Sequence, residues 1–209
     1  MRLCLWRLSH GGKMMVKTIL TVLVGYAALY AVVWLHEVGH AIGYAYYGCK
    51  KNWLHVNVRP YIFFSTPAPV DTEKSQFLTC RQHTIISYGG IIANLIWAVS
   101  GFVLAKLLPI SNEYIALFLT LFYTLHLAEI VSYLFIGNLY LVSDMAIIAS
   151  LYPKLRIPNL IAGVLLTVLY GVVLANVSSA ILVTVLFWNI TTILCMCGGR
   201  IVFSELHKR

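Results

Sequence analysis

The chain has 209 residues, of which 60% are hydrophobic and only 11% are charged, and its mean hydropathy is +0.84. Soluble domains carry about 25% charged residues, so this composition excludes an ordinary soluble protein and predicts a polytopic membrane protein. The net charge of +8 is spread over short segments without a basic stripe, which argues against nucleic acid as a partner and indicates contact with the lipid bilayer.

The first apolar run predicts a membrane-spanning helix. Residues 1–17 form a basic amino-terminal segment that lacks the short apolar core and small-residue cleavage site of a signal peptide. Residues 19–35 are uncharged, and the helical pattern continues to Tyr47 before Gly48 and two lysines end it. Because one crossing needs about 20 apolar residues, this segment is long enough to be the first span.

The longest polar stretch, residues 49–83, follows the first span. Apolar and polar residues alternate over residues 53–59, which is the period-two pattern of a strand. Pro60, Pro67 and Pro69 then interrupt the pattern, and proline in a sheet is confined to an edge. We therefore expect a small β element between the first and second spans, whose strand either pairs with an extended peptide or lies on the lipid headgroups.

Four further apolar runs complete an all-α polytopic membrane protein with about five transmembrane helices. They cover residues 84–108, 114–142, 161–177 and 180–195. With five spans, most of the lysines and arginines fall on the side that holds residues 50–83, 154–156 and 200–209. Since basic residues favour the cytoplasmic side, we expect the amino terminus to lie outside the cell and residues 49–83 to lie in the cytoplasm.

Residues 36–40, near the end of the first span, have the sequence HEVGH. On a helix, side chains at i and i+4 lie about 40° apart and one turn along, so His36 and His40 face one point. Imidazoles at this spacing are good zinc ligands, and the neighbouring Glu37 can accept a proton from water that the metal activates. Ionisable residues inside a span are costly and tend to be functional, so we interpret the pentapeptide as a zinc-dependent peptidase site.

A catalytic zinc usually has three protein ligands, so this site needs one more side chain. Two carboxylates lie in or beside a span: Glu129 within the third span, and Asp144 just past it. Spacing alone does not choose between them. Glu129 also lies three residues after His126, and these two side chains could instead satisfy each other inside the bundle.

In the order and spacing of three segments, the chain resembles the site-2 protease family of intramembrane zinc metalloproteases. The segments are residues 36–40 (HEVGH), 88–95 (YGGIIANL) and 137–144 (GNLYLVSD), and the resemblance covers residues 18–150. The chain differs from the family pattern at Gly90, where the family has proline, and at Met145, where the family has glycine. The proline-containing stretch that the family has between the positions of Asn138 and Asp144 is missing here, and the segment is shorter.

The resemblance implies a reaction and a set of site residues. The implied zinc ligands are His36, His40 and Asp144, and the implied catalytic base is Glu37. The amides of Asn94 and Asn138 are implied to bind the substrate. The expected reaction is hydrolysis of a peptide bond in or near a transmembrane segment of a membrane-anchored protein or peptide. Residues 18–152 would form the catalytic membrane core, and residues 153–209 would add transmembrane helices and a basic tail. Two alternatives stay open: an ion- or proton-conducting transporter, and a metal-binding relative without protease activity.

Overall fold

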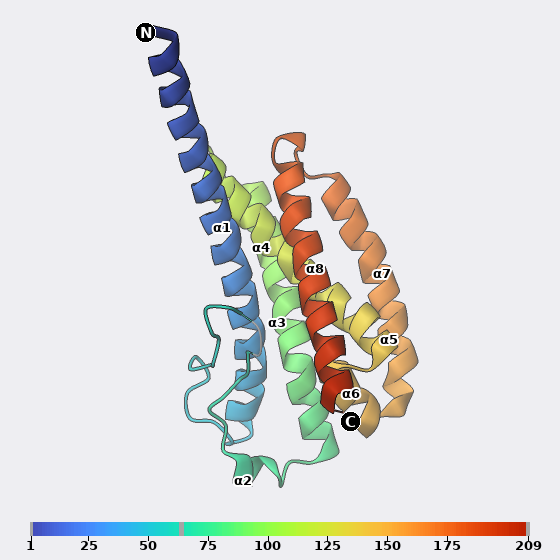
Figure 1. The fold of residues 1–209 in the computed structure, drawn as a ribbon. Coiled ribbons are helices and arrows are strands. Elements are labelled where there is room, and N and C mark those ends of the chain that lie inside the picture. The colour runs from blue at the N-terminus through green and yellow to red at the C-terminus, as the bar shows by residue number, and fades with distance from the viewer. Residues whose placement is uncertain (1, 63–64, 208–209) are drawn as a thin grey trace.

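The computed structural model describes residues 2–62 and 65–207, and these residues form a bundle of long helices (Figure 1). Five helices are long and apolar enough to cross a membrane, which confirms the predicted all-α architecture: Met14–Tyr46, Cys80–Leu107, Glu113–Tyr140, Pro153–Ala175 and Ser179–Val202. The elements in chain order are α1 (Arg2–Tyr46), α2 (Thr72–Ser75), α3 (Cys80–Leu107), α4 (Glu113–Val131), the π-helical turn η1 (Ser132–Gly137), α5 (Asn138–Tyr140), α6 (Ser143–Leu151), the 3-10 turn η2 (Pro153–Leu155), α7 (Arg156–Ala175) and α8 (Ser179–His207).

Capping side chains determine where two of the spans begin. Thr79 accepts a hydrogen bond from the backbone N–H of Gln82, and the Gln82 side chain accepts one from the Thr79 N–H, so a capping box starts α3. Asn112 accepts from two backbone N–H groups at the start of α4. These polar first turns extend α3 beyond the apolar run that predicted it, and they leave fewer backbone donors unpaired at the helix ends.

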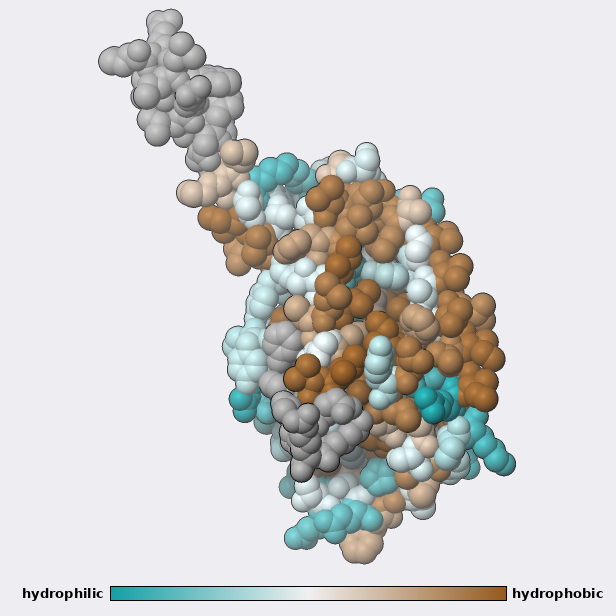
Figure 2. Space-filling view, turned by 45° about the vertical axis from the view of Figure 1, so that its right-hand side comes forward, coloured by the Kyte–Doolittle hydropathy of each residue, from teal (hydrophilic) through white to brown (hydrophobic). Residues whose placement is uncertain are grey.

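α4 is the central helix of the bundle. In an 18-residue apolar window of the span that it begins (Glu113–Tyr140) 72% of the residues are buried, against at most 28% in the corresponding windows of the other four spans. It packs against α1, α3, α7 and α8, and these outer helices present hydrophobic side chains outward (Figure 2). An apolar exterior over long helices is stable in lipid rather than in water, so the fold is that of an integral membrane protein.

The predicted β element is wrong. Between α1 and α3, the described residues form an isolated antiparallel bridge between Asn57 and Thr66 and no strand. The segment folds back along α1 (Figure 1). Tyr26 and Tyr30 of α1 hold it there, because their hydroxyls donate to backbone carbonyls of the segment. Residues 53–59 contact α1 through the Val58 carbonyl, while Trp53 and Leu54 stay exposed.

Lys50 connects three parts of the same segment through hydrogen bonds. Its side chain is buried, and the amine donates to three backbone carbonyls at 2.7–2.8 Å, those of His55, Pro67 and Pro69. A charged donor satisfies carbonyls that no strand partner reaches, and such hydrogen bonds are stronger than neutral ones. This contact fixes the position of the loop that covers the site described next.

Candidate metal centre

Two of the predicted metal ligands lie one turn apart on α1 and are buried. The Nε2 atoms of His36 and His40 are 3.1 Å apart. The Nδ1 atom of His40 lies 2.7 Å from the carbonyl oxygen of Ile86 on α3. The Nδ1 atom of His36 lies 3.0 Å from the side-chain amide of Asn94, also on α3. Contacts at both Nδ1 atoms orient the two rings so that their Nε2 atoms point to one place.

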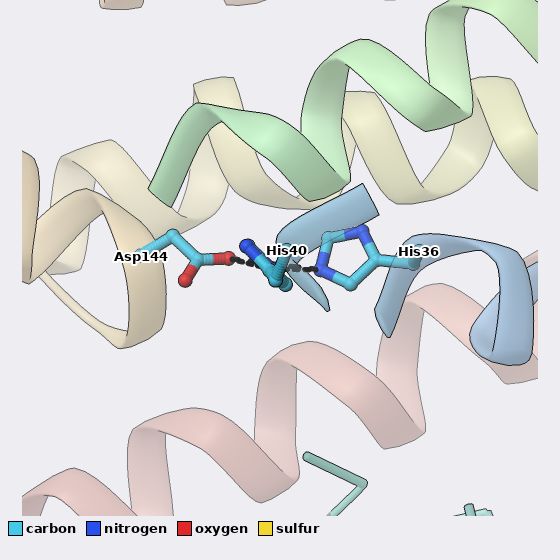
Figure 3. Close-up of side chains that lie close together, drawn as sticks. All are labelled: His36, His40 and Asp144. Atoms are coloured by element: carbon cyan, nitrogen blue, oxygen red, sulfur yellow. Dashed lines mark hydrogen bonds and ion pairs between the residues drawn. The ribbon is translucent and has the colours of Figure 1, made fainter. Parts of the chain in front are cut away.

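Asp144 completes the group from the first turn of α6. Its Oδ2 atom lies 3.6 Å from Nε2 of His36 and 3.4 Å from Nε2 of His40 (Figure 3). Burial raises the pKa of the Asp144 carboxyl, but the two imidazoles lower it more, so its pKa lies below the ordinary value and the group is anionic at neutral pH. The structure therefore brings together the three residues that the resemblance implied.

An unusual backbone leads the chain to Asp144. Leu141 and Ser143 have positive φ angles of 53° and 54°, in the left-handed region that costs a non-glycine residue about 1–3 kcal/mol. The preceding residues form a π-helical turn, and such turns occur frequently at functional sites. These features change the chain direction between α4 and α6, which positions the carboxylate against α1.

The donor set fits a small divalent ion. Ligand atoms about 2.0–2.2 Å from a tetrahedral zinc are separated from one another by about 3.3–3.6 Å. The observed separations of 3.1, 3.4 and 3.6 Å are close to this range. In the part of the chain that the structure describes, His36, His40 and Asp144 are the one group of three such side chains close enough to share an ion. Three protein ligands leave a fourth position for water or substrate, as in catalytic zinc sites.

Gly90 lets α3 approach the two histidines. A Cβ atom at this position would lie 2.6 Å from Nε2 of His36 and 2.6 Å from Nε2 of His40. Any other residue would therefore push the imidazoles away from their present positions. The proline of the resembled family would carry the same Cβ, so the glycine is the residue that this arrangement requires.

A cavity of about 850 Å³ opens onto the three ligands. The carboxylate-bearing side chain of Glu37 lines it from α1, Thr66 lines it from the loop before α2, and Met196 and Arg200 line it from α8. α8 runs past the ligand group, and part of the loop lies on the same side (Figure 3). Glu37, the candidate base, therefore lines the same cavity as the candidate ligands, as the pentapeptide predicted.

Glu129 belongs to a different pair. Its Oε2 atom accepts a hydrogen bond from Nη2 of Arg200 at 2.8 Å, and Nη1 of Arg200 donates to the Ser132 hydroxyl at 2.7 Å. Glu129 is therefore neither the third ligand nor the partner of His126. The sequence interpretation missed Arg200, although a lone arginine at the end of an apolar run is a signal that a buried partner exists.

Arg200 is also connected to the ligands through an aromatic ring. Its guanidinium lies 3.9 Å from the centre of the Tyr133 ring. That ring is stacked on His36, with centroids 4.7 Å apart and an interplanar angle of 9°. Because Tyr133 belongs to the π-helical turn η1, the His36 ring is packed against η1, and Arg200 of α8 packs on the other face of Tyr133.

The two asparagines predicted to bind substrate lie away from the lining of the cavity. Asn94 is fully buried, with its amide between His36 and His126. Asn138 is 1% exposed, and its Nδ2 atom donates to the backbone carbonyl of Arg156 at 2.7 Å. Both groups of the Asn94 amide are engaged, whereas Oδ1 of Asn138 is buried without a hydrogen-bond partner. Neither side chain lines the cavity.

Comparisons with known proteins were made for the whole chain. No protein-family model matches it, and no curated protein or solved structure matches it significantly. The function of the site is therefore inferred from its own geometry.

Proposed function

We propose that the protein is an intramembrane zinc metalloprotease of the site-2 protease type, which hydrolyses a peptide bond in or near a transmembrane segment of a membrane-anchored substrate. The observation that carries the proposal is the convergence of His36, His40 and Asp144 on one point, in a cavity that Glu37 also lines. Three ligands, a free coordination position and a nearby carboxylate are the parts that metal-assisted amide hydrolysis requires.

Each residue of the site has a distinct part in this reaction. When bound, zinc supplies a Lewis acid that polarises the scissile carbonyl and allows water to react at neutral pH. The Nε2 atoms of His36 and His40 and the carboxylate of Asp144 would hold it. Glu37 accepts the proton of the attacking water and returns it to the leaving amine.

The substrate must be extended where it is cleaved. In a helix the backbone carbonyls are already hydrogen-bonded and shielded by side chains, so a membrane-spanning helix has to unwind locally before one of its carbonyls reaches the site. The cavity has walls from two separate elements, the loop residues 65–67 and the Met196–Arg200 face of α8. We propose that the unwound segment lies between these walls.

We propose that the site lies at the cytoplasmic side of the cell membrane. The pentapeptide lies toward the end of α1 where the loop before α3, the η2 turn and the carboxyl-terminal part of α8 also gather (Figure 1). These segments, together with the first turns of α3 and α7, contain eight of the fifteen lysines and arginines of the chain. The enrichment of basic residues on cytoplasmic surfaces supports this orientation.

Ion or proton transport is the alternative function to the proposed protease activity. A conducting path needs polar groups that continue through several spans. The buried Asn189, away from the site, instead bonds Tyr170 and Thr124 on neighbouring helices, which closes a small structural cluster. The polar groups with metal-binding chemistry are gathered at one level, which favours a local site.

The test compares the wild type with Glu37→Gln and with Glu73→Gln, a matched change at an acidic residue on the short α2 helix. Purified proteins in detergent are mixed with fluorescence-quenched peptides that carry one apolar segment with short polar ends, and zinc is quantified in the same samples. We expect cleavage by the wild type and by Glu73→Gln, and loss of cleavage by Glu37→Gln with zinc retained. Undiminished cleavage by Glu37→Gln would overturn the mechanism. Zinc binding without cleavage by the wild type would favour a non-proteolytic metal protein.

A further inference from the structure

Tyr133 brings a hydroxyl group to the wall of the cavity, beside one of the metal ligands. Its ring is stacked on the His36 ring, with centroids 4.7 Å apart, and the Arg200 guanidinium lies 3.9 Å from the centre of the Tyr133 ring. An imidazole and a guanidinium this close to the centre of the ring would collide on one face, so they cover opposite faces. Tyr133 can therefore line the cavity only with its edge, which carries the hydroxyl.

The Tyr133 hydroxyl makes no hydrogen bond with any described residue, although the residue is only 5% exposed. Among the described residues, four side-chain polar atoms are fully buried and unpaired, and the Tyr133 oxygen is not one of them. The small exposure of this residue therefore includes its hydroxyl, which is open to the cavity that the residue lines. Because a buried tyrosine hydroxyl usually has a partner, the unpaired donor indicates that a ligand in the cavity supplies the acceptor.

Amide hydrolysis produces a suitable acceptor at this place. Attack on the scissile carbonyl puts negative charge on its oxygen, and donors that are already aimed at that oxygen stabilise the charge without reorganising during the reaction. The two asparagines expected to bind the substrate, Asn94 and Asn138, do not line the cavity. The Tyr133 hydroxyl does border the cavity, next to a ligand of the metal centre.

Contacts on both faces of the ring make Tyr133 a rigid donor. The ring cannot turn without displacing His36 or Arg200, so the hydroxyl is positioned before a substrate arrives. The cation over the ring face also draws electron density from the ring, which strengthens the O–H group as a donor. Tyr44 is the other tyrosine of the cavity lining, and no described aromatic or cationic group is stacked on its ring.

We propose that Tyr133 is a catalytic residue, whose hydroxyl donates a hydrogen bond to the oxyanion that forms when the scissile carbonyl is attacked. The hydroxyl keeps its proton throughout, so the proton transfers of the reaction stay with Glu37. The inference rests on the proposed function, because hydrolysis of the amide is what produces this oxyanion.

The Tyr133→Phe variant removes the hydroxyl and keeps the ring between His36 and Arg200. Loss of one oxyanion donor lowers kcat by about 100- to 1,000-fold. Because this hydrogen bond is made in the transition state and not with the bound substrate, KM and zinc content should stay as in the wild type. Tyr123→Phe is the matched control, since Tyr123 is also buried on the same membrane span but packs on Phe102 and does not line the cavity.

The closing experiment measures kcat, KM and zinc content in detergent for the wild type, Tyr133→Phe, Tyr44→Phe and Tyr123→Phe, with the fluorescence-quenched peptides. A phosphinic analogue of the same peptide, which carries an anionic tetrahedral group in place of the scissile amide, is tested as an inhibitor. We expect Tyr133→Phe alone to lose about 100- to 1,000-fold in kcat, and the analogue to bind it more weakly than it binds the wild type.

Four results from an active wild type would overturn this inference and leave the proposed function intact. They are undiminished kcat in Tyr133→Phe, a rise in KM alone, loss of zinc from this variant, and an equal fall of kcat in Tyr44→Phe or Tyr123→Phe. Loss of zinc belongs among them because the hydroxyl would then support the ligand group rather than the oxyanion. Absence of cleavage by the wild type would overturn both the inference and the proposed function.

Discussion

Replacing Arg200 by methionine should destabilise the protein by about 3–5 kcal/mol. The carboxylate of Glu129 is 2% exposed, and the Arg200 guanidinium at 2.8 Å is the cation that neutralises it. Methionine keeps much of the length of arginine but leaves this charge buried and unpaired, and the loss of the hydrogen bond to Ser132 adds to the cost. Unfolding of the purified protein by increasing mole fractions of SDS in mixed micelles measures the difference in free energy.

Two further variants show whether the unpaired charge is the cause. Adding Glu129→Gln to Arg200→Met removes the charge, so the double variant should recover most of the stability lost by the single one. Lys106→Met is the matched control, because this exposed cation also lies over an aromatic ring but has no buried carboxylate to neutralise, and it should cost less than about 1 kcal/mol. A loss below about 1 kcal/mol in Arg200→Met, or no recovery in the double variant, would refute the reasoning.

Three other changes have distinct expected outcomes. Asp144→Asn should weaken zinc binding by more than about 100-fold, measured by chelator competition, because it removes a ligand rather than a group that orients one; affinity equal to wild type would contradict the assignment. Gly90→Ala should destabilise by about 1–3 kcal/mol and lower zinc affinity, since the added methyl meets both imidazoles, whereas Gly171→Ala, with open space around it, should do neither. Lys50→Met should speed proteolysis within the loop before α2, and the exposed Lys51→Met should not; equal rates would show that the three carbonyl contacts do not hold this loop.

Local features of the structure could be predicted from the sequence. The spans follow from uncharged runs of the required length, and the pairing of His36 with His40 follows from helical periodicity alone. Both depend on neighbours within a few residues. The same reasoning failed for residues 53–59, where alternation suggested a strand, because the contacts of that loop are made by Lys50 and by tyrosines of α1.

The choice of third ligand depended on contacts that are distant in sequence. Spacing left Glu129 and Asp144 equivalent, and only the resemblance implied Asp144. In the structure Arg200 binds Glu129 from another helix. The π-helical turn and the left-handed residues before Asp144 are likewise set by tertiary packing, and the sequence carried no glycine at Leu141 or Ser143 to signal them. The position of Asn94 behind His36 also required the packing of α3 against α1.

The metal content and coordination of protein purified without chelators test the central claim most directly. We predict one zinc ion per chain, surrounded only by nitrogen and oxygen atoms at about 2.0–2.2 Å in X-ray absorption, and loss of that ion when His36 or His40 is replaced by alanine. Protein that stays metal-free in zinc-containing buffer, or a shell that contains sulfur at about 2.3 Å, would contradict the account.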